Sequence, residues 1–448
     1  MQSRGRLTPS HGISPVHKEL YIMTYEQTLA YIHATRSFGS KPGLSRIRAL
    51  MEACGNPQKT LRFVHITGTN GKGSTTTMVS NILRQAGFKV GTFVSPYVDD
   101  YRERMQINGE MIPREALSEQ LEKLLPAIEV IRNAGHFHPT EFELDTALAL
   151  NWWAQEQCDF VVLEVGMGGR LDCTNVIDAP LAAVLTPVSL DHMSVLGNTV
   201  TEIALDKCGI IKEGTTAVTC FDQDPDALQV IREYTASRNI PLMIPDKAAV
   251  QVLSSDITGS KVVYDGLTLT IPMPGAHQIQ NALTAFTVAR VLQSKGIAVS
   301  DANIVAGIGA TRFGGRLELI RRSPVCLLDG GHNPNGVDAL TKAIETLLPG
   351  KRIIAVMGMM AYKATGYCIP EVARRADVFI ATQCDYGRAL ASDKVAEIAR
   401  PHCSDVRVTS TITGAAELAL SLAGPDDAVI VCGSLYILHD ARVVLEEE

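Results

Sequence analysis

The chain has 448 residues. A single hydrophobic core rarely stabilises a chain of this length, so the length predicts two domains. Its residues are 46% hydrophobic and 20% charged, as in a globular protein, and its net charge of −7 argues against binding to nucleic acid or to membrane surfaces. No apolar run approaches the roughly 20 residues that span a bilayer. The ten cysteines form no CxxC pair, which argues against a zinc site and favours reduced thiols in the cytoplasm.

The first third of the chain predicts helices followed by a strand–loop–helix–strand unit. Residues 1–22 lack the apolar core of a signal peptide, and we interpret them as a flexible extension. Amphipathic helical patterns lie between Tyr25 and Cys54. The run "LRFVHI", a glycine-rich loop, the helical stretch "STTTMVSNILRQAG" and the run "FKVGTFVSP" come next. This order is the context that a phosphate-binding loop requires.

Strands and helices alternate through the rest of the chain. "CDFVVLEVG" and "LAAVLTPV" are apolar without a two-residue period, as expected of parallel strands buried on both faces. Residues 245–270 predict a small β-hairpin before a long helix that ends at Gly296. Five more apolar runs follow the glycine-rich "GIGATRFGGR" and alternate with helices. The predicted class is α/β, with a P-loop domain and mostly parallel sheet over 23–306, a linker over 307–315 and a smaller Rossmann-like domain over 316–448.

The stretch "HITGTNGKGS" departs from the standard P-loop spelling but keeps its chemistry. Gly68, Gly71 and Gly73 let backbone N–H groups approach phosphate oxygens, and the following helix turns its positive end to the same anion. Lys72 offers a charge to the phosphates, and Ser74 offers a hydroxyl to Mg²⁺. A glycine-rich turn without a ligand is the alternative, and the flanking strand and helix weigh against it.

Two further strand ends and one helix in the first domain carry candidate residues. Glu164 ends an apolar strand, where ligands of α/β sheets bind, and is a candidate Mg²⁺ ligand with Asp172 in reserve. A capping role is its alternative. His192 follows another strand. A metal-binding role and a purely structural role are equally compatible with it, because Mg²⁺ prefers oxygen ligands to an imidazole nitrogen. Lys207 lies in an apolar helical context, where a salt bridge to Asp206 or another acid is the plain interpretation.

The second domain repeats the pattern of a strand followed by a polar loop. In "LLDGGHNPNG", Asp329 and His332 lie at a strand end that we expect to face the first domain. Arg316, in the linker motif "FGGRLE", could reach a phosphate from across the cleft.

Ten motifs in order over about residues 24–440 resemble the folylpolyglutamate synthase/dihydrofolate synthase family, within the Mur ligase superfamily. They are "HITGTNGKGS", "SPYVDDYRERMQINGEMI", "TEFELDTALA", "LEVGMGGRLDCTN", "SLDHMSVLG", "IALDKCGIIK", "PGAHQIQNA", "GGRLE", "DGGHNPNG" and "GSLY". The family spells its loop TGTNGKGS, which accounts for the irregular P-loop. The resemblance implies an ATP-dependent amide ligase: a folate carboxylate is phosphorylated, and the amino group of L-glutamate attacks the acyl phosphate. Dihydropteroate is a second candidate acceptor.

The resemblance also implies roles for individual residues. Catalytic roles go to Lys72, His192 and Lys207, the last matching a lysine that is carbamylated in the family. Two Mg²⁺ ions would be held by Ser74, Glu164 and His192. The ATP-binding set is Gly68, Thr69, Asn70, Gly71, Lys72, Gly73, Ser74, Asn281, Arg316, Asp329 and His332. The folate- or pterin-binding set is Ser95, Pro96, Tyr97, Arg104, Thr140, Phe142, Glu143, Arg170, Leu171 and Asp172, of which Phe142 is equally well a core residue.

Some positions depart from the family pattern, and two other functions compete. Tyr97 stands where a histidine is frequent, and Tyr362-Lys363-Ala364 stands for Asp-Lys-Asp, which bears on the glutamate side. One rival is a peptidoglycan-precursor ligase of the same superfamily, which usually has a GKT loop and an extra N-terminal domain. The other is an ATP-driven switch or transporter ATPase, which needs no substrate pocket. The expected partners are small molecules only, without nucleic acid or membrane, and we expect a monomer in the cytoplasm.

Overall fold

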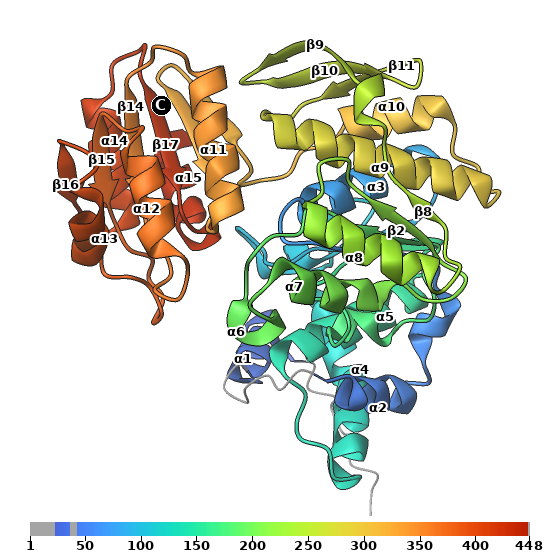
Figure 1. Cartoon of the computed structure of the whole chain (residues 1–448). Coiled ribbons are helices and arrows are strands. Elements are labelled where there is room, and N and C mark those ends of the chain that lie inside the picture. Colours follow the sequence, from blue (N-terminus) through green and yellow to red (C-terminus); the bar gives the residue numbers. More distant parts are fainter. Residues whose placement is uncertain (1–22, 36–42, 447–448) are drawn as a thin grey trace, which may run out of the picture.

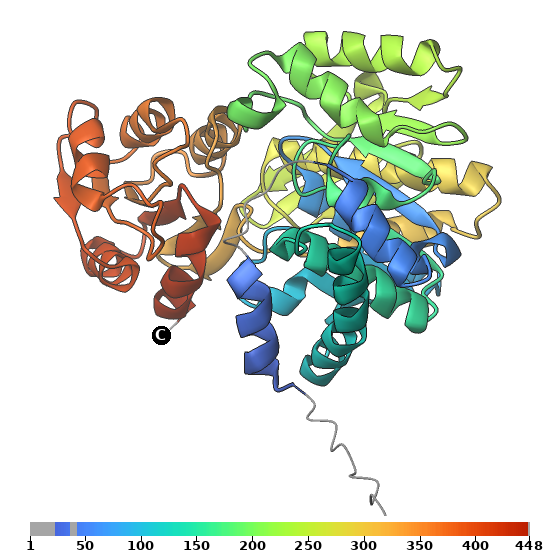
Figure 2. The same ribbon diagram turned by 90° about the horizontal axis from the view of Figure 1, so that it is seen from below.

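The computed structural model describes residues 23–35 and 43–446, so the expected extension over 1–22 lies outside the described residues. Two α/β bodies lie side by side, each built around its own sheet (Figures 1 and 2). None of the helices in the described ranges is both long and apolar enough to cross a bilayer.

The first domain contains an eight-stranded sheet in the order β4-β3-β2-β5-β1-β6-β7-β8. Its six parallel strands are β2 (Val90–Phe93), β5 (Phe160–Glu164), β1 (Phe63–Thr67), β6 (Ala182–Leu185), β7 (Thr216–Thr219) and β8 (Leu242–Met243). An antiparallel edge is added by β3 (Met105–Ile107) and β4 (Glu110–Met111). The four central strands are the predicted apolar runs, and their burial on both faces explains why these runs lack a two-residue period.

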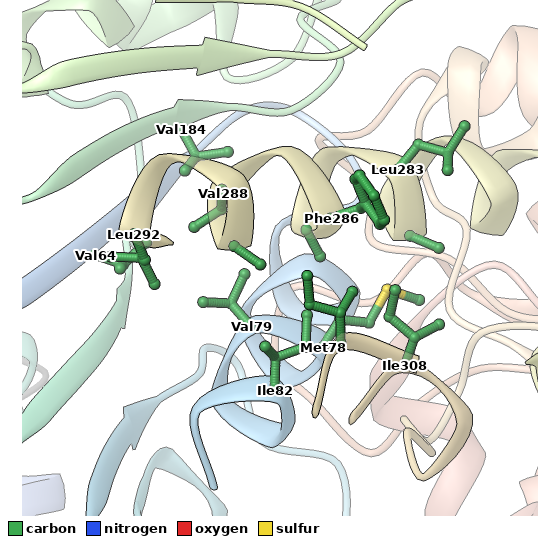
Figure 3. Packing of buried hydrophobic residues seen from close by; sticks show 14 of the residues in the cluster. Val64, Met78, Val79, Ile82, Val184, Leu283, Phe286, Val288, Leu292 and Ile308 are labelled. Atoms are coloured by element: carbon green, nitrogen blue, oxygen red, sulfur yellow. The ribbon is translucent and has the colours of Figure 1, made fainter. Parts of the chain in front are cut away.

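Alternate residues of β1 and β5 enter two separate cores. Val64 and Ile66 of β1 enter one core, whereas Phe63 enters the other. The first core (Figure 3) lies beneath α3 (Lys72–Gln85), α9 (Ala276–Ser294) and α10 (Asp301–Gly309). The second is covered by α1 (Tyr25–Ala34), α2 (Ser45–Ala53), α4 (Arg114–Asn133) and α5 (Glu141–Gln155). The domain also contains α6 (Met193–Leu196), α7 (Val200–Lys207) and α8 (Pro225–Ala236).

Two local predictions in this domain were wrong in part. The predicted hairpin is a three-stranded antiparallel sheet of β9 (Gln251–Asp256), β10 (Gly259–Tyr264) and β11 (Leu267–Ile271), because Leu269 and Ile271 also reach the first core. The predicted linker begins inside α10, which runs to Gly309. A Cβ at Gly307 would lie 2.5 Å from Ile82 Cα, so this glycine serves the close packing of α10 on α3.

The second domain contains a six-stranded sheet in the order β12-β13-β17-β14-β15-β16. Its five parallel strands are the five predicted runs: β13 (Val325–Asp329), β14 (Ile353–Met357), β15 (Val378–Ala381), β16 (Val406–Val408) and β17 (Ala428–Cys432). β12 (Glu318–Arg322) is an antiparallel edge strand. Helices pack on both faces: α11 (Pro334–Leu347), α12 (Thr365–Ala373) and α13 (Ser392–Ala399) on one, α14 (Ile412–Leu422) and α15 (Leu438–Glu446) on the other.

Candidate active site

The glycine-rich loop joins β1 to α3 and is fastened to the segment that follows β6. The Thr69 N–H donates to the Pro187 carbonyl at 2.8 Å. A Cβ at Gly68 would lie 1.9 Å from Thr186 Oγ1, so only glycine permits this close approach. Gly71, with φ 82°, caps α3 and directs the positive end of that helix into the space above the loop.

Two lysines converge on one carbonyl of this loop. Lys72 Nζ donates to Gly68 O at 3.2 Å, and Lys207 Nζ, at the end of α7, donates to the same oxygen at 2.9 Å. Burial first, and then the neighbouring Lys72, lower the pKa of Lys207 to about 7. The plain expectation of a salt bridge to Asp206 was wrong: that carboxylate accepts from the Gly169 N–H at 3.0 Å, and Lys207 forms no ion pair with any described residue.

The two carboxylates considered as metal ligands differ in how many hydrogen bonds they already accept from the protein. Glu164 Oε2 accepts one hydrogen bond, from the Ser95 N–H at 3.2 Å, and burial raises the pKa of Glu164 to about 7. The Asp172 carboxylate is already occupied: it accepts from the Met167 N–H at 2.9 Å and from the Thr174 N–H at 3.0 Å. Glu164 is therefore the acid that remains available to a ligand.

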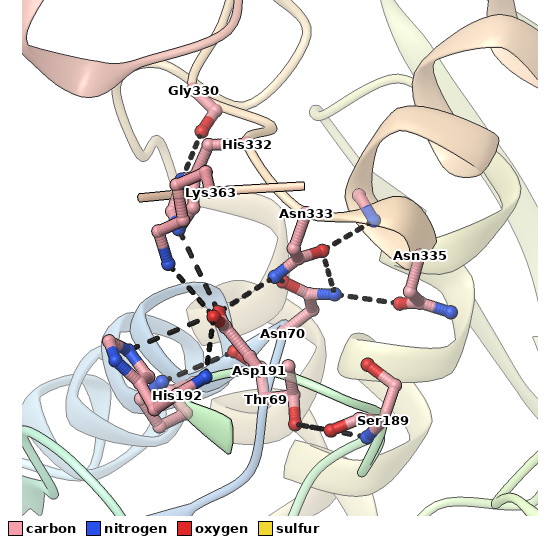
Figure 4. Close-up of polar contacts among 12 residues, drawn as sticks. Thr69, Asn70, Ser189, Asp191, His192, Gly330, His332, Asn333, Asn335 and Lys363 are labelled. Atoms are coloured by element: carbon pink, nitrogen blue, oxygen red, sulfur yellow. Dashed lines mark hydrogen bonds and ion pairs between the residues drawn. The ribbon is translucent and has the colours of Figure 1, made fainter. Parts of the chain in front are cut away.

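Asp191, in the loop after β6, is the centre of a contact with the second domain (Figure 4). Lys363 Nζ lies 2.9 Å from Asp191 Oδ1, and Asn333 Nδ2 donates to Asp191 Oδ2 at 3.2 Å. Nε2 of His192 and Nε2 of His332 each lie 4.0 Å from the same Oδ2. Although burial opposes it, the Lys363 ammonium holds the pKa of Asp191 well below its usual range.

Asn70 of the glycine-rich loop extends this contact between the domains. Its side-chain amide donates to Asn335 Oδ1 at 2.7 Å and to Asn333 Oδ1 at 3.2 Å (Figure 4). No role was predicted for Asn333 or Asn335, although both belong to the same motif as His332. The glycine-rich loop is therefore itself part of the interface between the domains.

The predicted ATP-binding residues all line one cavity of about 490 Å³ between the two domains. Lys207, Glu164 and His192 line it as well. Asp329 shapes the wall that the second domain contributes, because its carboxylate accepts the N–H groups of Leu317 at 2.9 Å and Gly331 at 2.8 Å.

The predicted folate-binding residues all line a second, larger cavity of about 940 Å³. The two cavities adjoin, because they share the lining residues Ser95, Pro96, Gly166, Met167 and Leu196. Most residues that line the larger cavity belong to the first domain, and three belong to the second.

Several of these lining residues also stabilise the fold. Thr140 and Glu143 form the capping box of α5, and Glu143 Oε2 lies 2.5 Å from Arg46 Nε. The Phe142 ring packs edge-on against Phe93 with their centroids 5.8 Å apart. Phe142 is therefore both a core contact and part of the cavity wall.

Some residues that line the larger cavity were not predicted. Asp145 lies within the quoted motif "TEFELDTALA"; its carboxylate accepts from the Tyr101 hydroxyl and lies 3.4 Å from Arg104 Nη1. Burial raises the pKa of Asp145 to about 6. The second domain contributes Tyr386, Arg388 and Tyr436, none of which the sequence analysis assigned.

The donor atoms beside the glycine-rich loop suit Mg²⁺. They do not form the kind of site in which protein side chains supply every ligand of a metal ion. Ser74 and Glu164 supply oxygen atoms to the smaller cavity, whereas the His192 side chain, 40% exposed, supplies an imidazole that Mg²⁺ does not prefer. Within the described part of the chain, no group of three or more His, Cys, Asp or Glu side chains could hold a metal ion. Two protein oxygens suit an ion that takes its other ligands from phosphate and water.

Two family models match the chain: the Mur ligase middle domain over residues 66–289, and the Mur ligase, glutamate ligase domain over residues 315–435. The chain is 36% identical over 432 residues to the dihydrofolate synthase/folylpolyglutamate synthase of Bacillus subtilis, and the match covers 93% of this chain and 98% of that protein. The chain belongs to the folylpolyglutamate synthase/dihydrofolate synthase family. The family expected from the motifs is thereby confirmed.

Other members of the folylpolyglutamate synthase/dihydrofolate synthase family are similar to this chain over nearly its whole length. The folylpolyglutamate synthase of Lacticaseibacillus casei is 33% identical, with 94% of this chain and 99% of that protein covered. The Mycobacterium tuberculosis folylpolyglutamate synthase complexed with ADP has a TM-score of 0.85 at 27% identity, covering 95% of this chain and 99% of that one. E. coli FolC in complex with DHPP and ADP has a TM-score of 0.81 at 28% identity, covering 94% and 97%. The α/β fold class is confirmed, and the peptidoglycan-precursor alternative is not favoured.

Proposed function

We propose that this chain is an ATP-dependent amide ligase that joins L-glutamate to the carboxylate of a folate. The observation that carries the proposal is the pair of adjoining cavities, one at the phosphate-binding loop and one lined by the predicted folate-binding residues. A carboxylate held at their shared wall, beside Ser95 and Gly166, would meet a phosphate held by the loop. An ATPase that only hydrolyses nucleotide has no need of the larger cavity.

In the first step, an oxygen of the folate carboxylate attacks the γ-phosphorus of ATP, the bond to the β–γ bridging oxygen breaks, and ADP leaves. The N–H groups of the loop and the N-terminus of α3 stabilise the phosphate charge. Lys72 exchanges its hydrogen bonds to Gly68 O and Thr69 O for phosphate oxygens. Ser74 and Glu164, with His192 as the third proposed ligand, would hold Mg²⁺, which when bound neutralises further phosphate charge.

In the second step, the neutral amino group of glutamate attacks the acyl carbon, the C–O bond to phosphate breaks, inorganic phosphate leaves, and the nitrogen loses one proton. His332 is suited to orient that amine. Its Nδ1 donates to Gly330 O at 2.8 Å, and burial lowers its pKa to about 4, so at neutral pH Nε2 presents a lone pair to the cavity. An ammonium or amine N–H of glutamate can donate to that nitrogen.

We further propose that Lys207 is carbamylated. Burial and the neighbouring Lys72 lower the pKa of Lys207 to about 7, which favours the neutral amine, and the neutral amine is the form that reacts with CO₂. Nζ forms a bond to the carbon of CO₂ and loses one proton, so a costly buried cation becomes an anion beside Lys72. Electron density for a carbamate on Lys207 Nζ in a crystal would support this, and a bare ammonium remote from metal would count against it.

The test is the release of ADP by the purified chain with ATP alone, with one co-substrate, and with both. We expect turnover only when L-glutamate and tetrahydrofolate are both present, and we expect Lys72→Ala to abolish it without changing the unfolding temperature. Lys59→Ala, at an exposed lysine outside both cavities, is the control. Steady ATP turnover that ignores both co-substrates would overturn the proposal.

The same assay with dihydropteroate in place of tetrahydrofolate decides whether the chain also makes dihydrofolate. We also propose that the chain acts as a monomer, since the lining residues of both cavities come together within one chain. Its free cysteines favour the cytoplasm. An active species of twice the chain mass in size-exclusion chromatography with light scattering would contradict the monomer.

A further inference from the structure

Four arginines line the larger cavity among the described residues, and three of them are matched by carboxylates that line the same cavity. These pairs are Arg46 with Glu143 at 2.5 Å, Arg104 with Asp145 at 3.4 Å, and Arg170 with Asp206 at 3.5 Å. The fourth, Arg388, comes from the second domain and forms no ion pair with any described residue. Arg388 is therefore the one arginine of this described lining without a carboxylate partner, although two further carboxylates, Glu141 and Asp172, also line the cavity.

Arg388 lies in the loop after β15, among tyrosines of the second domain. One Nη donates to the Tyr386 hydroxyl at 3.0 Å, and the guanidinium carbon lies 5.3 Å from the centroid of the Tyr386 ring and 5.4 Å from that of Tyr362. Tyr386 in turn stacks on Tyr436, with ring centroids 5.1 Å apart and an interplanar angle of 13°. These rings hold the guanidinium in place by contacts with its faces and one N–H, which leaves its other donors free.

The position of Arg388 determines what it can bind. It is exposed at the rim of the larger cavity, whereas Ser95 and Gly166 lie at the inner wall that both cavities share. A substrate whose reacting carboxylate lies at the inner wall would bring its remaining polar groups towards the rim. A guanidinium with free donors binds a carboxylate through two parallel hydrogen bonds.

The two candidate acceptors differ in this respect. The glutamate of a glutamylated folate carries two carboxylates, one that reacts and one that does not. Dihydropteroate carries one carboxylate, and that group is the one that reacts. Only the glutamylated acceptor can therefore present an anion to Arg388 while its reacting carboxylate occupies the shared wall.

We propose that Arg388, held by Tyr386 and Tyr436, is a specificity-determining residue that binds the non-reacting carboxylate of a glutamylated folate. This inference rests on the proposed function. Tyr362 is part of the same arrangement: an acid at that position would lie beside the guanidinium and neutralise it, whereas a tyrosine leaves the charge to the substrate.

The test is Arg388→Gln, with Arg400→Gln at an exposed arginine outside both cavities as the matched control. We expect KM for tetrahydrofolate monoglutamate to rise about 10- to 100-fold, the effect of losing a charge-assisted pair, with kcat changed less than threefold. KM for dihydropteroate should stay within about twofold, and Arg388→Lys should recover part of the loss. If wild type does not turn over dihydropteroate, its inhibition constant against tetrahydrofolate supplies the same comparison.

The remaining outcomes separate the inference from the proposed function. An unchanged KM for tetrahydrofolate, or an equal loss with both acceptors, would overturn the assignment of Arg388 to the acceptor. A rise in KM for L-glutamate alone, with either acceptor, would assign the guanidinium to the incoming amino acid and would also overturn it. Absence of glutamate-dependent turnover in wild type would instead contradict the proposed function.

Discussion

The ion pair between Asp191 and Lys363 makes a quantitative prediction about how the two domains are held together. Lys363→Met removes an ammonium, 8% exposed, from a carboxylate that is 13% exposed. At 2.9 Å their attraction is about 6 kcal/mol for an effective dielectric constant of about 20, and desolvation offsets part of it. Removing one partner of a buried pair costs about 3 kcal/mol, at the lower end of the usual range because this pair borders a cavity.

The groups that remain around Asp191 cannot replace the lysine. The Asn333 amide stays at 3.2 Å, while His192 and His332 are 4.0 Å away, and burial, the first cause of the lowered pKa of both, persists when the lysine is removed. Since 1.4 kcal/mol is tenfold, a loss of about 3 kcal/mol weakens the docked arrangement roughly 100-fold. We expect kcat/KM for glutamate-dependent ADP release to fall by up to that factor and the radius of gyration from small-angle scattering to increase.

The pH dependence and a double-mutant cycle check the reasoning. A carboxylate with a depressed pKa contributes stability above its unfolded value of about 3.8 and loses it only as pH falls through the folded pKa, so the loss should persist from about pH 8 down to pH 5.5. It should lessen at the lower pH only as far as removal of the Lys363 charge lets His192 or His332 take up a proton. Asp191→Asn combined with Lys363→Met should cost less than the sum of the two single changes by about 2 kcal/mol. Lys342→Met, whose ammonium is 70% exposed, is the control. Additive single effects, or a Lys363→Met enzyme within twofold of that control, would refute the account.

Three further predictions test the loop, the metal donor and the buried acid of the larger cavity. Gly71→Ala should raise KM for ATP at least about tenfold, because its Cβ would lie 2.4 Å from Asn281 Oδ1; Gly87→Ala, at φ 87° with open space around it, should cost only about 1–2 kcal/mol of stability and leave that KM unchanged. Ser74→Ala should raise the Mg²⁺ concentration for half-maximal activity several-fold, whereas Thr77→Ala, which removes a methyl group and a hydroxyl bonded to Gly73 O at 2.9 Å, should not. Because burial raises the pKa of Asp145 to about 6, the folded state holds a proton that the unfolded state has released above about pH 4. Wild type should therefore lose about 3 kcal/mol relative to Asp145→Asn between about pH 4 and 7, and parallel thermal-unfolding curves against pH for the two proteins would contradict this.

Much of the fold could be predicted because each central strand can be recognised from its own residues, without knowledge of distant parts of the chain. Each is a short apolar run that the sheet buries on both faces, and the glycine-rich loop between β1 and α3 carries its own chemistry. The strands that sequence analysis did not identify are β3, β4, β7, β8 and β12, which are short or lie towards the sheet edges, with five residues at most. The glycines of "GIGATRF" were assigned to a linker because the sequence does not distinguish a glycine that permits close helix packing from one that permits a flexible loop.

The predicted site residues gather in two cavities because most of them follow strands, and parallel strands bring their carboxyl ends to one edge. What the sequence could not supply is the partner of each charge. Asp206 and Lys207 are neighbours in the chain, yet consecutive residues of a helix point in different directions, so the lysine meets Gly68, 139 residues away.

The same reasoning explains why Asp191 and Arg388 were missed. Asp191 pairs with a lysine 172 residues later, across the boundary between the domains, and no local pattern marks that distance. Arg388 is informative for the opposite reason, because its feature is a missing partner, and a sequence shows which charges exist but not which remain unbalanced once the chain has folded. An unmatched cation at the rim of a cavity whose other arginines are matched is therefore a property of the folded molecule alone, and it is where the selectivity between the two acceptors can be tested.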